Sequence, residues 1–133
     1  MRWCGKPWLL DGPSEDSRYH AWVRPAALSS NSASAASVAG RAAGIAFTSD
    51  YHSHWPVARK LGSSFDTTDF TSLDQSVWVH RGDPWDDWWL LTSWTEQGHA
   101  GRSLGHRTLR TRDGRLVASM AQEAMIPGAR PRG

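Results

Sequence analysis

Three polar residues in this sequence are candidates for binding and activating a small molecule such as water: Asp50, Ser72 and Gln122. A carboxylate can act as a general base, a hydroxyl both donates and accepts hydrogen bonds, and a primary amide offers two donors and one acceptor. Each residue also has an ordinary structural interpretation. Asp50 could be a solvated helix terminus, Ser72 a turn residue before a strand, and Gln122 a partner for a backbone group.

The surroundings of Gln122 are the most informative. In an alternating segment it shares one strand face with Leu116, Ala118 and Met120, so its amide should point into apolar surroundings. An unpaired polar group in such a place costs about 1–3 kcal/mol. We therefore expect the amide of Gln122 to have hydrogen-bonding partners.

Two other groups of reactive side chains are weaker candidates. His52 and His54 could chelate a metal, but no motif rich in cysteine or carboxylate follows them. A group of tryptophans and arginines could bind nucleic acid, with the rings stacking on bases and the arginines neutralising phosphates. However, its tryptophans lie on both strand faces, which favours packing in a core or interface. Its members are Trp85, Trp88, Trp89, Trp94, Arg102, Arg107 and Arg110.

Composition limits the class of protein. The chain has 133 residues, enough for one hydrophobic core, and its net charge of +2 is too small and too dispersed to indicate nucleic-acid binding. No apolar run approaches the roughly 18 residues that span a bilayer, and the N-terminal segment lacks a signal-peptide core. The single cysteine, Cys4, can form no internal disulfide. We expect a cytoplasmic protein that neither enters a membrane nor binds nucleic acid.

The elements that must position these residues follow from periodicity. Residues 1–18 show no period and are expected to be an irregular leader, while residues 19–24 alternate weakly and stop at Pro25, as a short strand would. Asn31, Ser32 and Ser34 could cap a following helix. The apolar and small positions of that helix recur at spacings of three and four, at Val38, Ala42, Ile45 and Ser49.

From residue 71 onward the period becomes two. Strands are predicted at residues 76–80, 88–95, 105–112 and 115–126, and the Asp113-Gly114 pair predicts a two-residue type I′ hairpin. One strand, one helix and four successive strands are typical of a hotdog fold, an α+β architecture in which an antiparallel sheet wraps a central helix. We therefore predict a hotdog domain at residues 19–127 and a disordered tail at residues 128–133.

Several motifs in order resemble the C-terminal half of acyl-CoA thioesterase II. They are Phe-Thr-Ser-Asp at residues 47–50, TSLDQSVWVHR at 71–81, DWWLL at 87–91 and RDGRLVASMAQE at 112–123. The resemblance covers residues 19–126. It implies a hydrolase of acyl-CoA thioesters in which Asp50, Ser72 and Gln122 orient the attacking water, with no metal or organic cofactor.

This sequence departs from that family pattern in three ways. Ser72 stands for the commoner threonine, Gln75 stands for the usual histidine beside Asp74, and the N-terminal hotdog of the family has no counterpart here. The family builds its acyl pocket between two hotdogs, so the resemblance implies self-association as a dimer of hotdogs or a larger assembly. A non-catalytic module that binds acyl-CoA or a partner subunit is the alternative.

A direct attack by Ser72 on the thioester would require a histidine nearby as base. The next histidine along the strand, His80, should lie about 26 Å from Ser72 if the chain is extended. We therefore favour attack by water.

Overall fold

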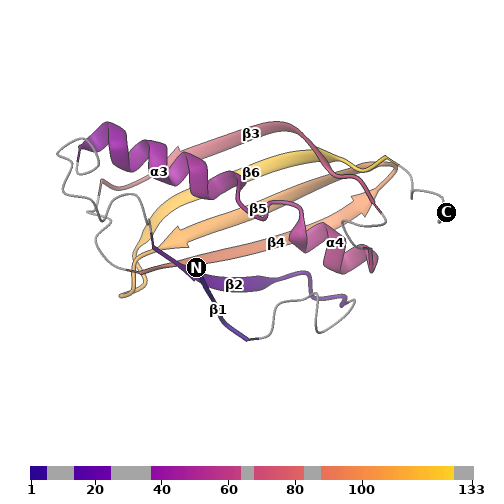
Figure 1. Cartoon of the computed structure of the whole chain (residues 1–133), viewed down its shortest axis with the longest axis horizontal. Coiled ribbons are helices and arrows are strands. Elements are labelled where there is room, and N and C mark those ends of the chain that lie inside the picture. Colours follow the sequence, from indigo (N-terminus) through magenta and orange to yellow (C-terminus); the bar gives the residue numbers. More distant parts are fainter. Residues whose placement is uncertain (6–13, 25–36, 64–67, 83–87, 128–133) are drawn as a thin grey trace.

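The computed structural model describes residues 1–5, 14–24, 37–63, 68–82 and 88–127. These residues form a six-stranded antiparallel sheet in the order β1-β2-β4-β5-β6-β3, and two helices cover one of its faces (Figure 1). The elements in chain order are β1 (Arg2–Trp3), β2 (Tyr19–Val23), α3 (Val38–Asp50), α4 (Trp55–Leu61), β3 (Thr71–Val79), β4 (Trp89–His99), β5 (Arg102–Arg110) and β6 (Leu116–Met125). The hotdog architecture predicted from the sequence is confirmed.

The core lies between α3 and the inner face of the sheet. Every second residue of β4 is buried from Trp89 to Thr95, as expected for a sheet with one covered face. Ile45 of α3 is 1% exposed and packs against this face. The buried apolar cluster consists of Val23, Ile45, Trp89, Leu91, Leu109, Val117, Ala118 and Met120.

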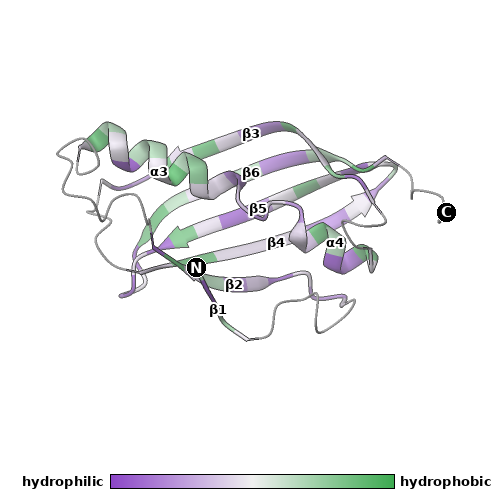
Figure 2. Cartoon of the chain, viewed as in Figure 1, coloured by the Kyte–Doolittle hydropathy of each residue, from purple (hydrophilic) through white to green (hydrophobic). Residues whose placement is uncertain are grey.

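Helix α3 is apolar on more than its buried side. Val38 and Phe47 are 74% and 76% exposed, and the hydrophobic colouring of the helix continues onto its outward side (Figure 2). Ser37 caps the helix, because its hydroxyl accepts a hydrogen bond of 3.0 Å from the amide of Gly40. The three caps predicted upstream, at residues 31, 32 and 34, lie outside the described residues.

The structure adds two elements that the sequence analysis did not predict. Helix α4 has a proline in its first turn and ends at Gly62, whose φ of 61° is left-handed. Strand β1 lies within residues 1–18, which were expected to be irregular. It was not predicted because two residues are too few to show a period. Trp3 of β1 stacks on Trp55 of α4 with ring centroids 4.8 Å apart, so this edge strand is also packed against a helix.

The hairpin predicted at Asp113-Gly114 has a different turn type from the one expected. At the predicted hairpin only Gly114 has positive φ, at 89°, so the turn is not of type I′, which needs positive φ at both central residues. The type I′ geometry occurs instead between β4 and β5, where Ala100 and Gly101 have φ of 49° and 74°. As a result β4 and β5 extend through the region expected to be a loop. The expected tail at residues 128–133 lies outside the described residues.

Candidate active site

The structure brings Asp50, Ser72 and Gln122 together through the side chain of Gln122. Its Nε2 donates to Oδ1 of Asp50 at 3.0 Å and to Oγ of Ser72 at 2.8 Å. Both amide hydrogens therefore have acceptors, and the prediction that this amide finds partners is confirmed. Gln122 is 7% exposed, whereas Asp50 and Ser72 are exposed, so a buried amide holds two groups that solvent can reach.

Strand register and helix length explain this meeting. Gln122 lies on the inner face of β6, where it pairs with Gln75 of β3 and Gly105 of β5. Asp50 is the last residue of α3 and reaches the same point from above the sheet. Between Ser72 and Asp74 the register of β3 shifts, and such an irregularity changes where the neighbouring side chains point.

His54 is a neighbour of this site that the sequence analysis did not identify. Its Nε2 lies 3.3 Å from Oγ of Ser72, whereas His80, the histidine considered earlier, pairs with Ser119 at 2.9 Å. The chain reversal between α3 and α4 brings His54 to β3, although 18 residues separate it from Ser72. The distance predicted for His80 therefore did not exclude a histidine beside Ser72, because His54 takes that place.

The protonation state of His54 allows its ring to accept a hydrogen bond. Burial lowers the pKa of His54 below its ordinary 6.5, the charge of Arg107 lowers it further, and Asp50 opposes both effects. The imidazole is neutral at pH 7. Ser72 can then donate its proton to Nε2 of His54 while its oxygen accepts from Gln122.

Two side chains fix the last turn of α3 on the sheet. Nη1 of Arg107, on the inner face of β5, donates to the carbonyl of Ser49, and Nε2 of Gln75 donates to the hydroxyl of Ser49. A cation at a helix C-terminus is favourable because of the exposed carbonyls there. Gln75, noted above as a departure from the family pattern, thus anchors the residue next to Asp50.

A small recess lies beneath the three residues. It is too narrow to hold a water molecule, and it is lined by Ser49, Ser53, Gln75, Gly105, Arg107, Met120, Ala121 and Gln122. Most of these lining residues are polar. The alternation of the strand indicated that Arg107 faces inward, because it shares a strand face with the apolar Leu109. Its closeness to Asp50 depends on how α3 crosses the sheet.

A model of the family described as acyl-CoA thioesterase C-terminal domain matches residues 1–126 of the chain. The chain belongs to this thioesterase family. The match begins at residue 1, so it includes strand β1, which the sequence resemblance from residue 19 onward did not include.

Solved structures agree on the fold of this thioesterase-family domain. The acyl-CoA thioesterase II TesB2 of Mycobacterium marinum superposes with a TM-score of 0.72 at 21% identity, over 92% of this chain and 46% of that one. The tesB protein of Mycobacterium avium subsp. paratuberculosis gives 0.71 at 22% identity, over 84% and 42%. The smu.793 protein of Streptococcus mutans, solved with acetyl-CoA, gives 0.67 at 12% identity, over 97% and 90%. The chain spans less than half the length of the two mycobacterial proteins.

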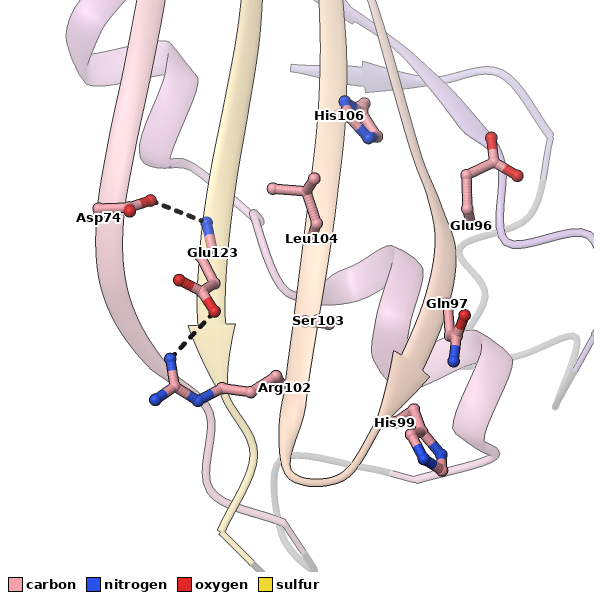
Figure 3. Close-up of a pocket in the computed structure, with 9 residues that line it drawn as sticks. All are labelled: Asp74, Glu96, Gln97, His99, Arg102, Ser103, Leu104, His106 and Glu123. Carbon is pink, nitrogen blue, oxygen red and sulfur yellow. Dashed lines mark hydrogen bonds and ion pairs between the residues drawn. The ribbon is translucent and has the colours of Figure 1, made fainter.

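The outer face of the sheet carries a separate, open groove of about 660 Å³. In Figure 3 the helices lie behind the strands, and the side chains of Asp74, Arg102 and Glu123 lie on the uncovered face. Glu123 there forms an ion pair with Arg102 at 3.0 Å, and its backbone amide donates a hydrogen bond to Oδ1 of Asp74 at 3.3 Å. None of the three candidate residues lines this groove.

Among the described residues, no group of three or more histidine, cysteine or acidic side chains is placed to hold a metal ion. His52, once a candidate ligand with His54, instead packs on Trp55 with ring centroids 4.0 Å apart. No helix in the described part of the chain is long and apolar enough to cross a membrane.

The environment of His52 predicts a pH dependence of stability. Burial, followed by the charge of Arg107, lowers the pKa of His52 from 6.5 to about 4. Between these two values the unfolded chain binds more protons than the folded one, so stability falls as the pH falls. The melting temperature of the wild type should therefore decrease from pH 7 to pH 5, and that of His52→Asn should decrease less over the same range. Asn tolerates the left-handed backbone at this position, where φ is 58°.

Thermal melts of wild-type protein, His52→Asn and the control His99→Asn over this pH range test the prediction. His99 is exposed at the end of β4, so its replacement should leave the wild-type slope unchanged. An identical slope in all three proteins would contradict this role of His52.

Proposed function

We propose that this domain hydrolyses acyl-CoA thioesters to a free carboxylic acid and CoA, with water as the nucleophile. The observation that carries the proposal is the bridge from one amide, that of Gln122, to both Asp50 and Ser72. Membership of the thioesterase family supports the reaction class. The acetyl-CoA in the Streptococcus mutans structure supports the substrate class, since that protein has the same fold.

In this proposal each residue has a task. Two acceptors that share one amide lie side by side, so one water molecule can bond to Asp50 and Ser72 together. Asp50 accepts a proton as the water oxygen attacks the thioester carbonyl. The C–S bond then breaks, and the CoA sulfur leaves as the thiol after receiving that proton from Asp50. Gln122 is a positioning residue, because both of its N–H groups are used to hold the other two.

His54 adds a constraint on this mechanism. The neutral imidazole 3.3 Å from Ser72 orients the hydroxyl, and the same pair could in principle activate Ser72 for direct attack. Direct attack would use His54 rather than Asp50 as the base of the first step, although Gln122 holds the Asp50 carboxylate and the Ser72 hydroxyl together. The shared amide therefore favours water activation, and no organic cofactor or metal has a task in it.

The proposal predicts thiol release from at least one member of a panel of acyl-CoAs of different chain lengths. Asp50→Asn keeps an acceptor for Gln122 but removes the base, so kcat/KM should fall at least about 100-fold with the melting temperature unchanged. Asp74→Asn is a matched control, because its carboxylate lies on the opposite face of the same sheet. Full activity in Asp50→Asn would remove this residue from the mechanism.

We further propose that a second copy of the chain completes the site. β3 is an edge strand in the part of the sheet that the structure describes, and such edges promote association. Large apolar side chains are exposed along it and along α3, namely Leu73 (43%), Trp78 (52%), Val79 (47%), Val38 (74%), Phe47 (76%) and Tyr51 (46%). In this proposal a partner covers this surface.

Phe47→Glu should dissociate such an assembly, because the carboxylate would be desolvated in the interface. Light scattering should report a mass near 14.8 kDa for this variant and a multiple of it for the wild type. Leu104→Glu is the control, since Leu104 is 46% exposed on the outer face. A monomeric wild type that turns over acyl-CoA would contradict the proposal of self-association.

A second candidate is a non-catalytic module that binds acyl-CoA or a partner subunit. It is favoured by one observation, that the chain corresponds to 42% and 46% of the two mycobacterial proteins. Tight CoA-ester binding without turnover, from folded protein, would select this function over hydrolysis. Under either function the exposed single thiol of Cys4 supports a reducing, cytoplasmic location.

A further inference from the structure

The turn that joins α3 to α4 holds one residue in an unusual backbone conformation. Tyr51 has φ of −67° and ψ of 121°, and His52 follows with φ of 58°. The amide of Ser53 donates to the carbonyl of Asp50 at 3.2 Å. These angles and this bond match a type II turn, whose third residue needs positive φ and is usually glycine or asparagine. In this chain the third residue is a histidine.

Contacts from several elements hold His52 in this conformation. Its carbonyl accepts hydrogen bonds from the hydroxyl of Tyr19 at 3.1 Å and from the amide of Trp55 at 3.3 Å. Its ring packs on those of Tyr51 and Trp55, with centroids 3.9 and 4.0 Å apart, and Trp3 of β1 lies 5.5 Å away. An unfavourable φ persists only where the surrounding structure fixes it, and such positions concentrate at functional sites.

The candidate active site lies on both sides of this turn. Asp50 is two residues before His52, and His54 is two residues after it. Oδ1 of Asp50 accepts from the amide of Gln122, which also donates to Ser72. Nε2 of His54 lies 3.3 Å from Oγ of Ser72. A different turn type would change the direction of the chain between Asp50 and His54, so the conformation of one residue bears on both contacts.

We propose that His52 is a positioning residue, whose left-handed backbone places Asp50 and His54 together beside Ser72. The inference rests on the proposed function and adds to it a residue that touches no reacting atom. Its role is one of conformation, so the imidazole can be replaced by a side chain that tolerates positive φ. Asparagine tolerates it well, alanine less, and the β-branched valine least.

The test is a series of three variants, His52→Asn, His52→Ala and His52→Val, assayed on the acyl-CoA that the wild type hydrolyses fastest. All three lack the ring, and they differ in their tolerance of positive φ. We expect kcat to decrease from asparagine through alanine to valine, by at least about ten-fold across the series, because a small displacement of a catalytic group slows the reaction strongly. KM should change by less than about three-fold, since the displaced groups act in the chemical step.

Ala100→Val is the matched control. Ala100 also has positive φ, at 49°, but it lies in the turn between β4 and β5, and β6 separates β5 from the strand that carries Ser72. Valine is as unfavourable there as at position 52, so the melting temperature should fall in both variants. Measured well below the lower melting temperature, kcat of Ala100→Val should stay within about two-fold of the wild type, because its strain is remote from the site.

The kinetic outcomes separate positioning from stability. Equal kcat values in folded His52→Asn and His52→Val overturn the inference and leave the hydrolase intact. An equal loss of kcat in Ala100→Val overturns it as well. If His52→Val does not fold, the asparagine and alanine variants decide by the same comparison.

A second measurement applies if the wild type hydrolyses no acyl-CoA, in which case the proposed function fails. Burial and then the charge of Arg107 lower the pKa of His54 below its ordinary 6.5, and Asp50 opposes both effects. The NMR signal of the His54 ring, identified by its loss in His54→Gln, should therefore titrate at higher pH in His52→Val, where the ring leaves this place. It should be unchanged in His52→Asn and Ala100→Val. The same midpoint in all these proteins and the wild type overturns the inference.

Discussion

The buried amide of Gln122 is the constraint on which the site depends. It sits on the inner face of β6, where leaving either N–H unpaired would cost about 1–3 kcal/mol, and it meets this demand with Asp50 and Ser72. The end of α3 and the edge strand β3 are thus fixed to β6 by one side chain. Two further bonds, from Arg107 and Gln75 to Ser49, keep the last turn of α3 in place. The position of Asp50 is therefore set by the sheet as well as by its own helix.

The inner face of the sheet has two regions with different chemistry. Around Ile45 it is an apolar core that stabilises the fold through burial. Around Arg107 it is polar, and buried hydroxyls there are used in bonds such as that from Ser17 to the carbonyl of Thr95 at 2.7 Å. Burying polar groups does not add to the hydrophobic stabilisation of a small domain.

Sequence periodicity was sufficient to predict the sheet because alternation reflects which face is buried. β4 and β6 followed from it directly, and the inward-facing position of Gln122 correctly indicated that its amide must have partners. Helix α4 was not predicted, although Pro56 and Gly62 mark its ends, because seven residues are too few to establish a helical period. The turn types were assigned to the wrong hairpin, since Ala100 adopts a positive φ that its residue type does not favour.

The contacts of His54 and Arg107 could not be read from the sequence for a different reason. Each depends on how a helix crosses the sheet, which no local pattern encodes. His54 reaches Ser72 only after the chain reverses between α3 and α4, and Arg107 reaches Ser49 only because α3 ends above β5. Both residues lie in segments where pattern analysis had suggested other uses, namely a metal site and a basic surface.

The central claim is that the amide of Gln122 positions a base and a hydroxyl for attack by water. The rate of thiol release by Gln122→Glu tests it most directly, measured on the acyl-CoA that the wild type hydrolyses fastest. Glutamate has nearly the same shape as glutamine but replaces the donating amide with a carboxylate, which repels Asp50 and cannot donate when ionised. The account predicts a folded protein whose kcat falls by about 100-fold or more. Turnover near the wild-type rate would contradict it.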